Sequence, residues 1–198
     1  MAAKKGNEIA TIDVVLVTYK VGETEIGLKT ASEVSVSVQS ETTDAVKLIV
    51  KGVLIAQKRE QTTVTGHAIT MTDNVFNPEL VKMLQGGTIK YWQDGDQSAE
   101  TDSDAGFGVA SYTPPVAGSA DEVKEGVLNV YSAIYDAAGL ITGYEKCEYP
   151  NCKGVPVAFN VVDGEFRAPE YTINSAPKTG EAPYKITYLK ELPEVSAL

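Results

Sequence analysis

Alternation of apolar and polar side chains is the feature that most constrains this fold. In EVSVSVQS, residues 33–40, the three valines Val34, Val36 and Val38 alternate with polar residues. Successive side chains of a strand point to opposite faces of a sheet, so this stretch predicts a half-buried strand. Runs rich in β-branched and aromatic residues predict further strands at 13–19, 45–56, 62–72, 88–92, 126–136 and 155–161. The fold class is therefore expected to be mainly β.

One short helix is expected within this pattern, at about 77–85. Asn77 is placed to cap its start, Pro78 suits the first helical position, and Gly86 suits the end. Its apolar face would consist of Leu80, Met83 and Leu84. Such a short helix is unstable alone, so it should pack on a sheet or close the end of a barrel.

The C-terminal part combines a predicted turn with an interrupted pair of strands. In VVDGEFR, Asp163 and Gly164 are expected to form a type I′ hairpin turn. Residues 170–189, EYTINSAPKTGEAPYKITYL, contain two alternating runs separated by a segment with a proline near each end. Fully extended, that segment spans at most roughly 26 Å, and its prolines cannot donate to a strand ladder. We expect an arm at 175–184 that reaches a neighbouring chain, with a surface crossover between two sheets as the alternative.

Length and composition predict a single domain, 1–198, with four less regular segments. Residues 1–8 form an N-terminal segment, and no apolar stretch follows its lysines as it would in a signal peptide. Residues 40–62 carry apolar side chains on both strand faces, so this extension should be buried inside a sandwich or by a neighbouring chain. Residues 94–120 should form a long acidic loop. The fourth segment is the arm at 175–184.

The charge balance excludes ordinary nucleic-acid binding. The chain has 27 acidic and 17 basic residues, a formal net charge of −10, and no cluster of lysines or arginines. Proteins that grip phosphate need a basic face. No stretch is apolar over the length of a membrane span, so a soluble cytosolic product is expected.

The groups that could support catalysis or metal binding are few. His67, the one histidine, lies in a strand pattern and should be a partly exposed sheet residue. Cys147 and Cys152 flank a predicted Tyr-Pro-Asn turn; free thiols are expected, with a disulfide or half a zinc site as alternatives. The acidic loop lacks the glycine and the final glutamate of an EF-hand, which favours a solvated loop over a calcium site. No catalytic, metal or cofactor site is predicted, and the chain is not expected to be an enzyme.

The order of these elements resembles that of one family of virion proteins. Three stretches carry the resemblance: IATIDVVLVTYKVGETEIGLKTASEVSVSVQSETTDAVKL, NPELVKML followed by GGTIKYW, and CKGVPVAFNVVDGEFRAPEYTINSAPKTGEAPYKITYL. Together they resemble the major tail (tail tube) proteins of long-tailed phages and prophages of Gram-positive bacteria. The resemblance covers most of the chain and rests on element order and the C-terminal run. It is weakest over the acidic loop.

The resemblance implies a β-sandwich or barrel-like tail tube fold with one flanking helix and extended arms. Six copies would form a ring, and stacked rings would form a tube through which the genome passes. The implied partners are further copies of the chain, the tape measure protein, the tail terminator and baseplate or hub proteins. DNA would pass without specific binding, and no membrane would be involved. The protein would be assembled in the cytoplasm of the bacterial host and reside in the virion tail.

Two sets of functional residues follow from the resemblance. Interfaces between subunits or rings would include Val46, Leu48, Ile49, Val50, Val53, Ile55, Pro177, Lys178, Pro183 and Tyr184. The wall of the lumen would include Glu33, Ser35, Ser37, Gln39, Thr63, Thr65 and His67. A wall poor in basic residues would let DNA slide because it repels phosphate.

Two other classes of function stay open. A monomeric Ig-like or carbohydrate-binding β-sandwich could use the ten tyrosines and Trp92 as a platform for sugars. A small β-barrel enzyme would depend on His67. A monomeric mass in solution would favour the binding module, and turnover that disappears when His67 is replaced would favour the enzyme.

Overall fold

The computed structural model describes residues 9–92, 108–116, 123–158, 161–164 and 167–195. In these residues the chain is mainly β with one short helix, as the alternation predicts. The elements are β1 (Thr11–Val21), β2 (Thr24–Leu28), β3 (Ala31–Thr43), β4 (Val46–Val50), β5 (Val53–Lys58), β6 (Gln61–Asp73), α1 (Pro78–Gln85), β7 (Thr88–Tyr91), β8 (Val109–Thr113), β9 (Gly126–Tyr135), β10 (Ile141–Gly154), β11 (Glu170–Ser175) and β12 (Lys185–Leu189).

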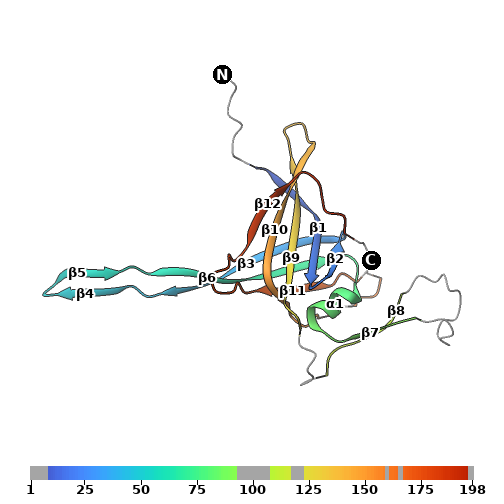
Figure 1. Ribbon diagram of the computed structural model, residues 1–198, viewed down its shortest axis with the longest axis horizontal. Helices are drawn as coiled ribbons and strands as arrows, with labels where there is room; N and C mark the ends of the chain where they lie inside the picture. The colour runs from blue at the N-terminus through green and yellow to red at the C-terminus, as the bar shows by residue number, and fades with distance from the viewer. Residues whose placement is uncertain (1–8, 93–107, 117–122, 159–160, 165–166, 196–198) are drawn as a thin grey trace.

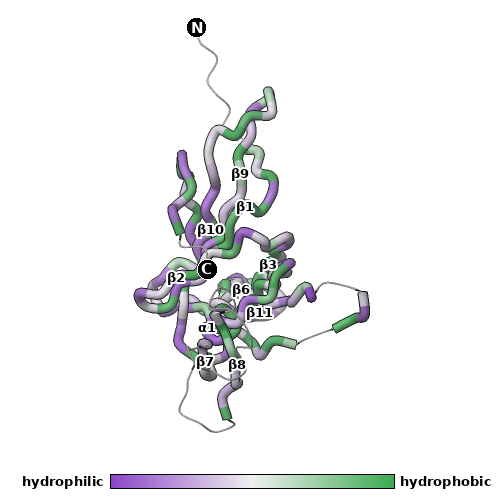
Figure 2. Tube along the Cα trace, turned by 90° about the vertical axis from the view of Figure 1, so that its right-hand side faces the viewer, coloured by the Kyte–Doolittle hydropathy of each residue, from purple (hydrophilic) through white to green (hydrophobic). Residues whose placement is uncertain are grey.

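Eight of the described strands form one antiparallel sheet that folds over on itself. Its order is β2-β1-β9-β10-β11-β6-β3, and β12 also pairs with β10. In Figure 1, β1, β9, β10 and β12 run up the page while β3, β6 and β11 run across it. Figure 2, turned by 90°, shows β1, β9 and β10 rising above the region of β3, β6 and β11. The sheet therefore forms two crossing layers, the upright layer and the transverse layer.

β10 joins the two layers because it changes partners along its length. Its first part pairs with β9 and β12, and its last residues, Cys152 to Gly154, pair with β11. The register on β9 shifts between Tyr149 and Cys152, which marks a β-bulge. Asn151 in this bulge has a φ of 50°, and Pro150 has no N–H to donate. Bulges bend a strand and increase its twist, so this one redirects β10 from one layer to the other.

The predicted turn at Tyr-Pro-Asn is therefore wrong, because CEYPNC lies within the single strand β10. Cys147 is half-buried, Cys152 is buried, and both are free thiols. Burial raises the pKa of the Cys152 thiol to about 12 and also raises that of Cys147. Both thiols therefore stay protonated at neutral pH, unlike a nucleophilic or metal-binding cysteine.

The core lies between the layers and beneath α1. The upright layer contributes Val17, Tyr19 and Leu128, and the transverse layer contributes Ile69, Met71, Tyr171 and Ile173, all completely or almost completely buried. The helix adds Leu80, Val81 and Leu84, whereas Met83 of the predicted apolar face is only half-buried. Burying a large apolar side chain contributes about 1.5–3 kcal/mol, so α1 is stabilised mainly by this contact.

The ends of α1 are as predicted. The side-chain oxygen of Asn77 accepts hydrogen bonds from the N–H groups of Glu79 and Leu80, at 2.9 and 3.1 Å. Gly86 has a φ of 80°, and its N–H donates to the carbonyl of Lys82 at 2.8 Å. The helix is thus capped at both ends and can end directly before β7.

Residues 40–62 contain a projecting hairpin rather than the single strand predicted at 45–56. β4 and β5 pair around Lys51 and Gly52, whose φ values of 50° and 81° fit a type I′ turn. The paired ends of β3 and β6 form its stalk, and Figure 1 shows the hairpin far from the body of the molecule. Every residue of β4 and β5 is exposed, so the alternative that this segment is buried inside its own sandwich is wrong.

Three further predictions need correction. Residues 155–158 and 161–162 form no strand. In the first stretch, the N–H groups of Val155 and Val157 donate to different elements, to the Thr172 carbonyl of β11 and to the Gln85 side chain of α1. A turn does occur at Asp163 and Gly164, but only Gly164 has positive φ, so it is not type I′. The predicted acidic loop contains β8, which pairs with β7. Phe159 and residues 1–8, 93–107 and 117–122 lie outside the described residues.

The contact between α1 and β10 generates a prediction at Gly154. A Cβ added there would lie 2.5 Å from both Cβ and the carbonyl oxygen of Leu84, so the helix would have to move. Gly154→Ala should therefore lower the free energy of unfolding by about 1–3 kcal/mol. Urea denaturation measures this, with Gly108→Ala as control because nothing lies within 4 Å of its added Cβ. Equal stability of the two variants would show that α1 does not pack closely on β10.

Candidate assembly surfaces

The outer face of the transverse layer is a polar surface built from β3, β6 and β11. Strand pairing places Ser35 beside Thr70 and Thr70 beside Thr172, so three hydroxyl side chains lie in one row across the sheet. The neighbouring rows are Ser37, Ala68 and Asn174, and Glu33, Thr72 and Glu170. Residues on the other face of the same strands, such as Ile69 and Ile173, are buried in the core. We call this surface the polar face.

No lysine or arginine occurs anywhere in β3, β6 or β11. The charged residues of the polar face are carboxylates: Glu33, Glu41 and Glu170, all exposed. Hydroxyl, amide and carboxylate groups on a base-free sheet give a surface that is hydrated but repels phosphate.

The seven residues predicted to line a lumen do not all share this face. Glu33, Ser35, Ser37 and Gln39 alternate along one side of β3, and Thr63 pairs with Glu41 on the same side. The β3–β6 register then shifts, with Gln39 opposite Gly66 and Ser40 opposite Val64, so Thr65 is the extra residue of a bulge. The bulge changes which alternate residues of β6 face outward.

His67 therefore lies on the opposite side from the polar face, and the prediction that it is a partly exposed lumen residue is wrong. It is 2% exposed and pairs with Val38 and Ser175. Its ring packs edge-on against Tyr149 and Tyr184, with centroid distances of 5.3 and 5.5 Å, and its Nδ1 lies 3.4 Å from Ser175 Oγ. Burial lowers the pKa of His67, so the ring is neutral at neutral pH.

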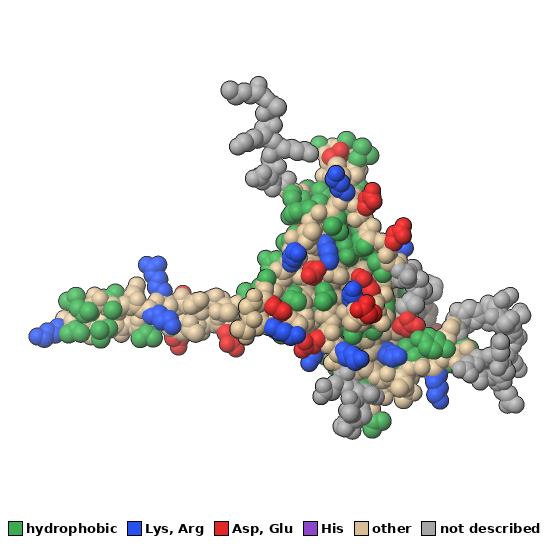
Figure 3. Space-filling model, in the orientation of Figure 1, with side chains coloured by type: hydrophobic (Ala, Val, Ile, Leu, Met, Phe, Trp, Pro, Cys, Tyr) green, Lys and Arg blue, Asp and Glu red, His purple; other side chains and the backbone are tan. Residues whose placement is uncertain are grey.

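The projecting hairpin carries the second surface. The predicted interface residues Val46, Leu48, Ile49, Val50, Val53 and Ile55 are 48–66% exposed. They occupy both faces of β4 and β5, and Figure 3 shows apolar side chains gathered at the end of the molecule furthest from the body. Hairpin residues 46–58 also contain three lysines, Lys47, Lys51 and Lys58, and no acidic residue. The hairpin tip is thus apolar and basic on an acidic chain.

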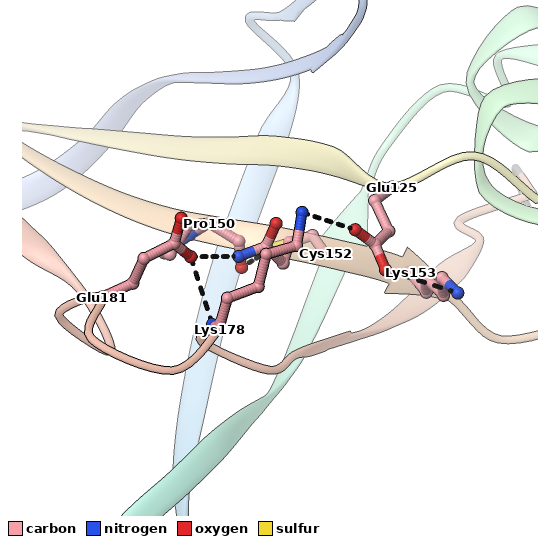
Figure 4. A network of polar contacts seen from close by, with 7 residues as sticks. Glu125, Pro150, Cys152, Lys153, Lys178 and Glu181 are labelled. Atoms are coloured by element: carbon pink, nitrogen blue, oxygen red, sulfur yellow. Dashed lines mark hydrogen bonds and ion pairs between the residues drawn. The ribbon is translucent and has the colours of Figure 1, made fainter.

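The segment at 175–184 is a crossover from β11 to β12 rather than an arm free of its own chain. It turns at Lys178 and Glu181, where the Glu181 N–H donates to the Lys178 carbonyl at 2.9 Å. Figure 4 shows Glu181 held against the bulge of β10: its Oε2 accepts from Asn151 Nδ2 at 2.7 Å and from Lys178 N–H at 3.1 Å. Lys178 Nζ lies 3.3 Å from Glu125 Oε2, and this contact lowers the pKa of Glu125.

Among the other predicted interface residues, Pro177 and Pro183 are half-buried in this crossover, and Tyr184 is 44% exposed beside His67. The prolines explain why the crossover forms no strand ladder. The polar contacts explain why it lies on its own β10, and an interface role for these residues stays a prediction.

The described residues also bear on the other classes of site. Within them, no three His, Cys, Asp or Glu side chains are grouped as a metal site requires. No helix in the described residues is long and apolar enough to span a membrane. An open groove of about 400 Å³ lies between β2, α1 and β7, and its carboxylate, Glu79, is already bound by the hydroxyl of Tyr91 at 2.9 Å.

No protein-family model and no curated protein matches the sequence. Among solved structures, the chain is similar to one from the sheath-tube complex of PVC, an extracellular contractile injection system in its extended state. That match has 12% identity, covers 91% of this chain and 92% of that chain, and has a TM-score of 0.41. A chain of the tube-terminating cap of the anti-feeding prophage matches at 8% identity over 96% and 100% of the two chains, with a TM-score of 0.42. A chain of the baseplate of the same particle, symmetrised sixfold, matches at 11% identity over 88% and 91%, with a TM-score of 0.30. Scores this low do not establish a common fold, so the function is argued below from the surfaces of the chain.

Several residues of these surfaces are missed by the sequence analysis. Thr70, Thr72, Thr172 and Asn174 complete the polar face, and the alternation in EYTINS would have placed the last two. Tyr149 supports His67 from β10, but its position depends on the bulge, which has no distinct sequence signal.

The burial of His67 predicts a pH dependence of stability. Its pKa is lowered in the folded protein and is near 6.5 when unfolded, so the unfolded state binds the proton first as pH falls. The contribution of neutral His67 to the free energy of unfolding should be fully present above about pH 7. Below about pH 6.5 the free energy of unfolding should decline by at most ~1.4 kcal/mol per pH unit from this group. His67→Phe keeps the ring contacts and should remove this part of the decline. Urea denaturation at several pH values measures it; identical pH profiles for both proteins would contradict the assignment.

The crossover predicts a local effect at Glu181. Glu181→Ala removes the acceptor for Asn151 and Lys178, so amide hydrogen exchange in 176–184 should accelerate while β9 and β10 stay protected. Glu194→Ala is the control, because Glu194 is also an exposed glutamate but lies outside the crossover. Unprotected amides throughout 176–184 in the unaltered protein would instead support a free arm.

Proposed function

We propose that this chain is a structural protein that assembles with copies of itself into stacked six-membered rings, forming the tube of a phage tail through which DNA is delivered. The observation that carries the proposal is the projecting hairpin, whose apolar side chains are exposed on both faces. The polar face and the sheet edges support it.

The hairpin requires a partner on energetic grounds. An isolated two-stranded hairpin is at best marginally stable in water, and monomeric proteins rarely expose a large contiguous apolar patch. Each of its large side chains would contribute up to about 1.5–3 kcal/mol if fully buried by another molecule. Because the hairpin projects away from its own body, as Figure 3 shows, that burial has to come from another chain.

The polar face suits the wall of a DNA-conducting tube. DNA-binding proteins gain affinity when lysines and arginines release the counterions of phosphate, and β3, β6 and β11 supply no such residue. Carboxylates on the wall would repel the passing phosphates and keep the DNA free to slide. Ring formation would place the polar faces of the copies around the lumen.

The edge of β3 gives the copies a way to join. In the described residues β3 pairs only with β6, so its other edge presents unpaired N–H and C=O groups. Such an edge is an aggregation hazard in a monomer, and it disappears when neighbouring sheets close into a barrel. Closure of six copies would make one continuous inner sheet.

In this function the chain is not an enzyme and needs no cofactor. Its partners would be further copies of itself, a tape measure protein inside the tube, a tail terminator at one end and baseplate or hub proteins at the other. Assembly would take place in the cytoplasm of the bacterial host, and the final location would be the virion tail.

A single substitution in the hairpin tests the proposal. Ile49 is 59% exposed in the single chain, so Ile49→Asp should leave the fold unchanged but prevent assembly by placing a charge in the interface. Electron microscopy and sedimentation of the concentrated protein should show rings or tubes for the unaltered chain and monomers for the variant. Val116→Asp is the control, because Val116 is 76% exposed and lies outside the hairpin. A chain that stays monomeric at every concentration would favour the carbohydrate-binding module instead.

A further inference from the structure

The upright and transverse layers meet at an open corner (Figure 1), and exposed apolar side chains lie on their facing sides there. On the upright side, pairing places Ile186 of β12 opposite Cys147, which packs against the core, and Tyr188 opposite Glu145. The ring of Tyr184 contacts the buried ring of His67 on β6. The side chains at 184, 186 and 188 therefore point toward the transverse layer.

β3 contributes the exposed apolar side chains on the transverse side of this corner. Val36 and Val38 pair with Ile69 and His67, so they lie on the core side of the transverse layer. The sequence predicts that both valines are buried, but they are 39% and 62% exposed, because the upright layer does not extend over them. Ile186 and Tyr188 are 43% and 54% exposed for the same reason. We use the name notch for Val36, Val38, Glu145, Tyr184, Ile186 and Tyr188.

Glu145 gives the notch its charge. Its side chain is half-buried, its Oε1 lies 3.8 Å from Cys147 Sγ, and it interacts with the Tyr188 hydroxyl. No cation pairs with it among the described residues. An unpaired carboxylate beside exposed apolar side chains offers a charge with which a cation of another molecule can pair when it docks there.

The projecting hairpin has the complementary properties. It presents exposed apolar side chains together with Lys47, Lys51 and Lys58, and no acidic residue. Its own notch is out of reach, because the hairpin extends away from the body (Figure 1). We propose that the notch receives the β4–β5 hairpin of a second copy of this chain, with a hairpin lysine pairing with Glu145. The proposal rests on the proposed self-assembly and identifies the surface that receives the hairpin.

Both partners lose exposed apolar surface in this arrangement, and the ion pair fixes their orientation. In the described residues the outer edge of β12 has no partner strand, so backbone bonds from a hairpin strand can extend the upright layer there. The arrangement is also head-to-tail, since hairpin and notch are different surfaces, and such contacts continue from copy to copy.

Photo-crosslinking tests where the hairpin docks. A photoreactive phenylalanine analogue replaces Leu54 in the hairpin, and the protein is assembled from a mixture of ¹⁴N- and ¹⁵N-labelled chains so that crosslinks between copies can be recognised by mass. The expected products join the hairpin to peptides that contain residues 34–38, 144–149 or 184–188 of another copy. The analogue at Val75, exposed but outside the hairpin, is the control.

The outcomes separate this proposal from the proposed function. Crosslinks between copies that reach other peptides would overturn the notch as receptor while self-assembly stands. A chain that sediments as a monomer and gives no crosslinks between copies would overturn both.

Glu145→Gln tests the ion pair separately. The variant keeps the shape of the side chain, so its unfolding should be unchanged while self-association weakens by about tenfold or more. Glu148→Gln is the matched control, because Glu148 lies on the opposite face of β10 and pairs with Lys146 of its own chain at 2.7 Å. An equal loss in both variants, or none in Glu145→Gln, would overturn the role of Glu145.

Discussion

The bulge at Pro150 and Asn151 is the constraint on which the rest of this structure depends. By redirecting β10, it lets one sheet supply both layers, so the core is enclosed by a folded sheet and one capped helix. The crossover is attached at the same point, because Asn151 donates to Glu181. The bulge therefore determines both the angle between the layers and the path of the chain into β12. The polar face is the outer side of the transverse layer, and the notch lies within the angle between the two layers.

Most strands and the helix could be predicted from the sequence because their signals are local. Alternation locates β1, β3, β6 and β9, and Asn77, Pro78 and Gly86 locate α1. The errors occur where one residue changes the phase of a strand. Thr65 bulges out of β6 and moves His67 to the core side, and CEYPNC contains proline and asparagine, which suit a turn as well as a bulge. A bulge depends on the partner strand, which the sequence of one strand does not contain.

Burial was the other property that the sequence did not determine. An apolar strand predicts that something covers it, but the covering surface can belong to the same chain or to another. The apolar residues of the hairpin and Val36 and Val38 of β3 fit the strand pattern as well as Ile69 and Met71 do, yet only Ile69 and Met71 are buried in the core. The distribution of charge is more informative. Lysines are absent from the three strands of the polar face and present on the hairpin, and this separation is visible in the sequence once the strands are known.

The stalk and the hairpin are two successive ladders, the end of β3 with the start of β6 and then β4 with β5, and neither contributes to the core. Their length can therefore change without changing the body. Because a strand repeats its side-chain orientation every two residues, additions of two residues to each strand lengthen the reach by about 6.6–6.8 Å and keep each side chain on its face. Additions of one residue would exchange the faces. In an assembly built on this hairpin, the spacing between copies is therefore a stepwise variable that evolution or design can adjust by paired insertions.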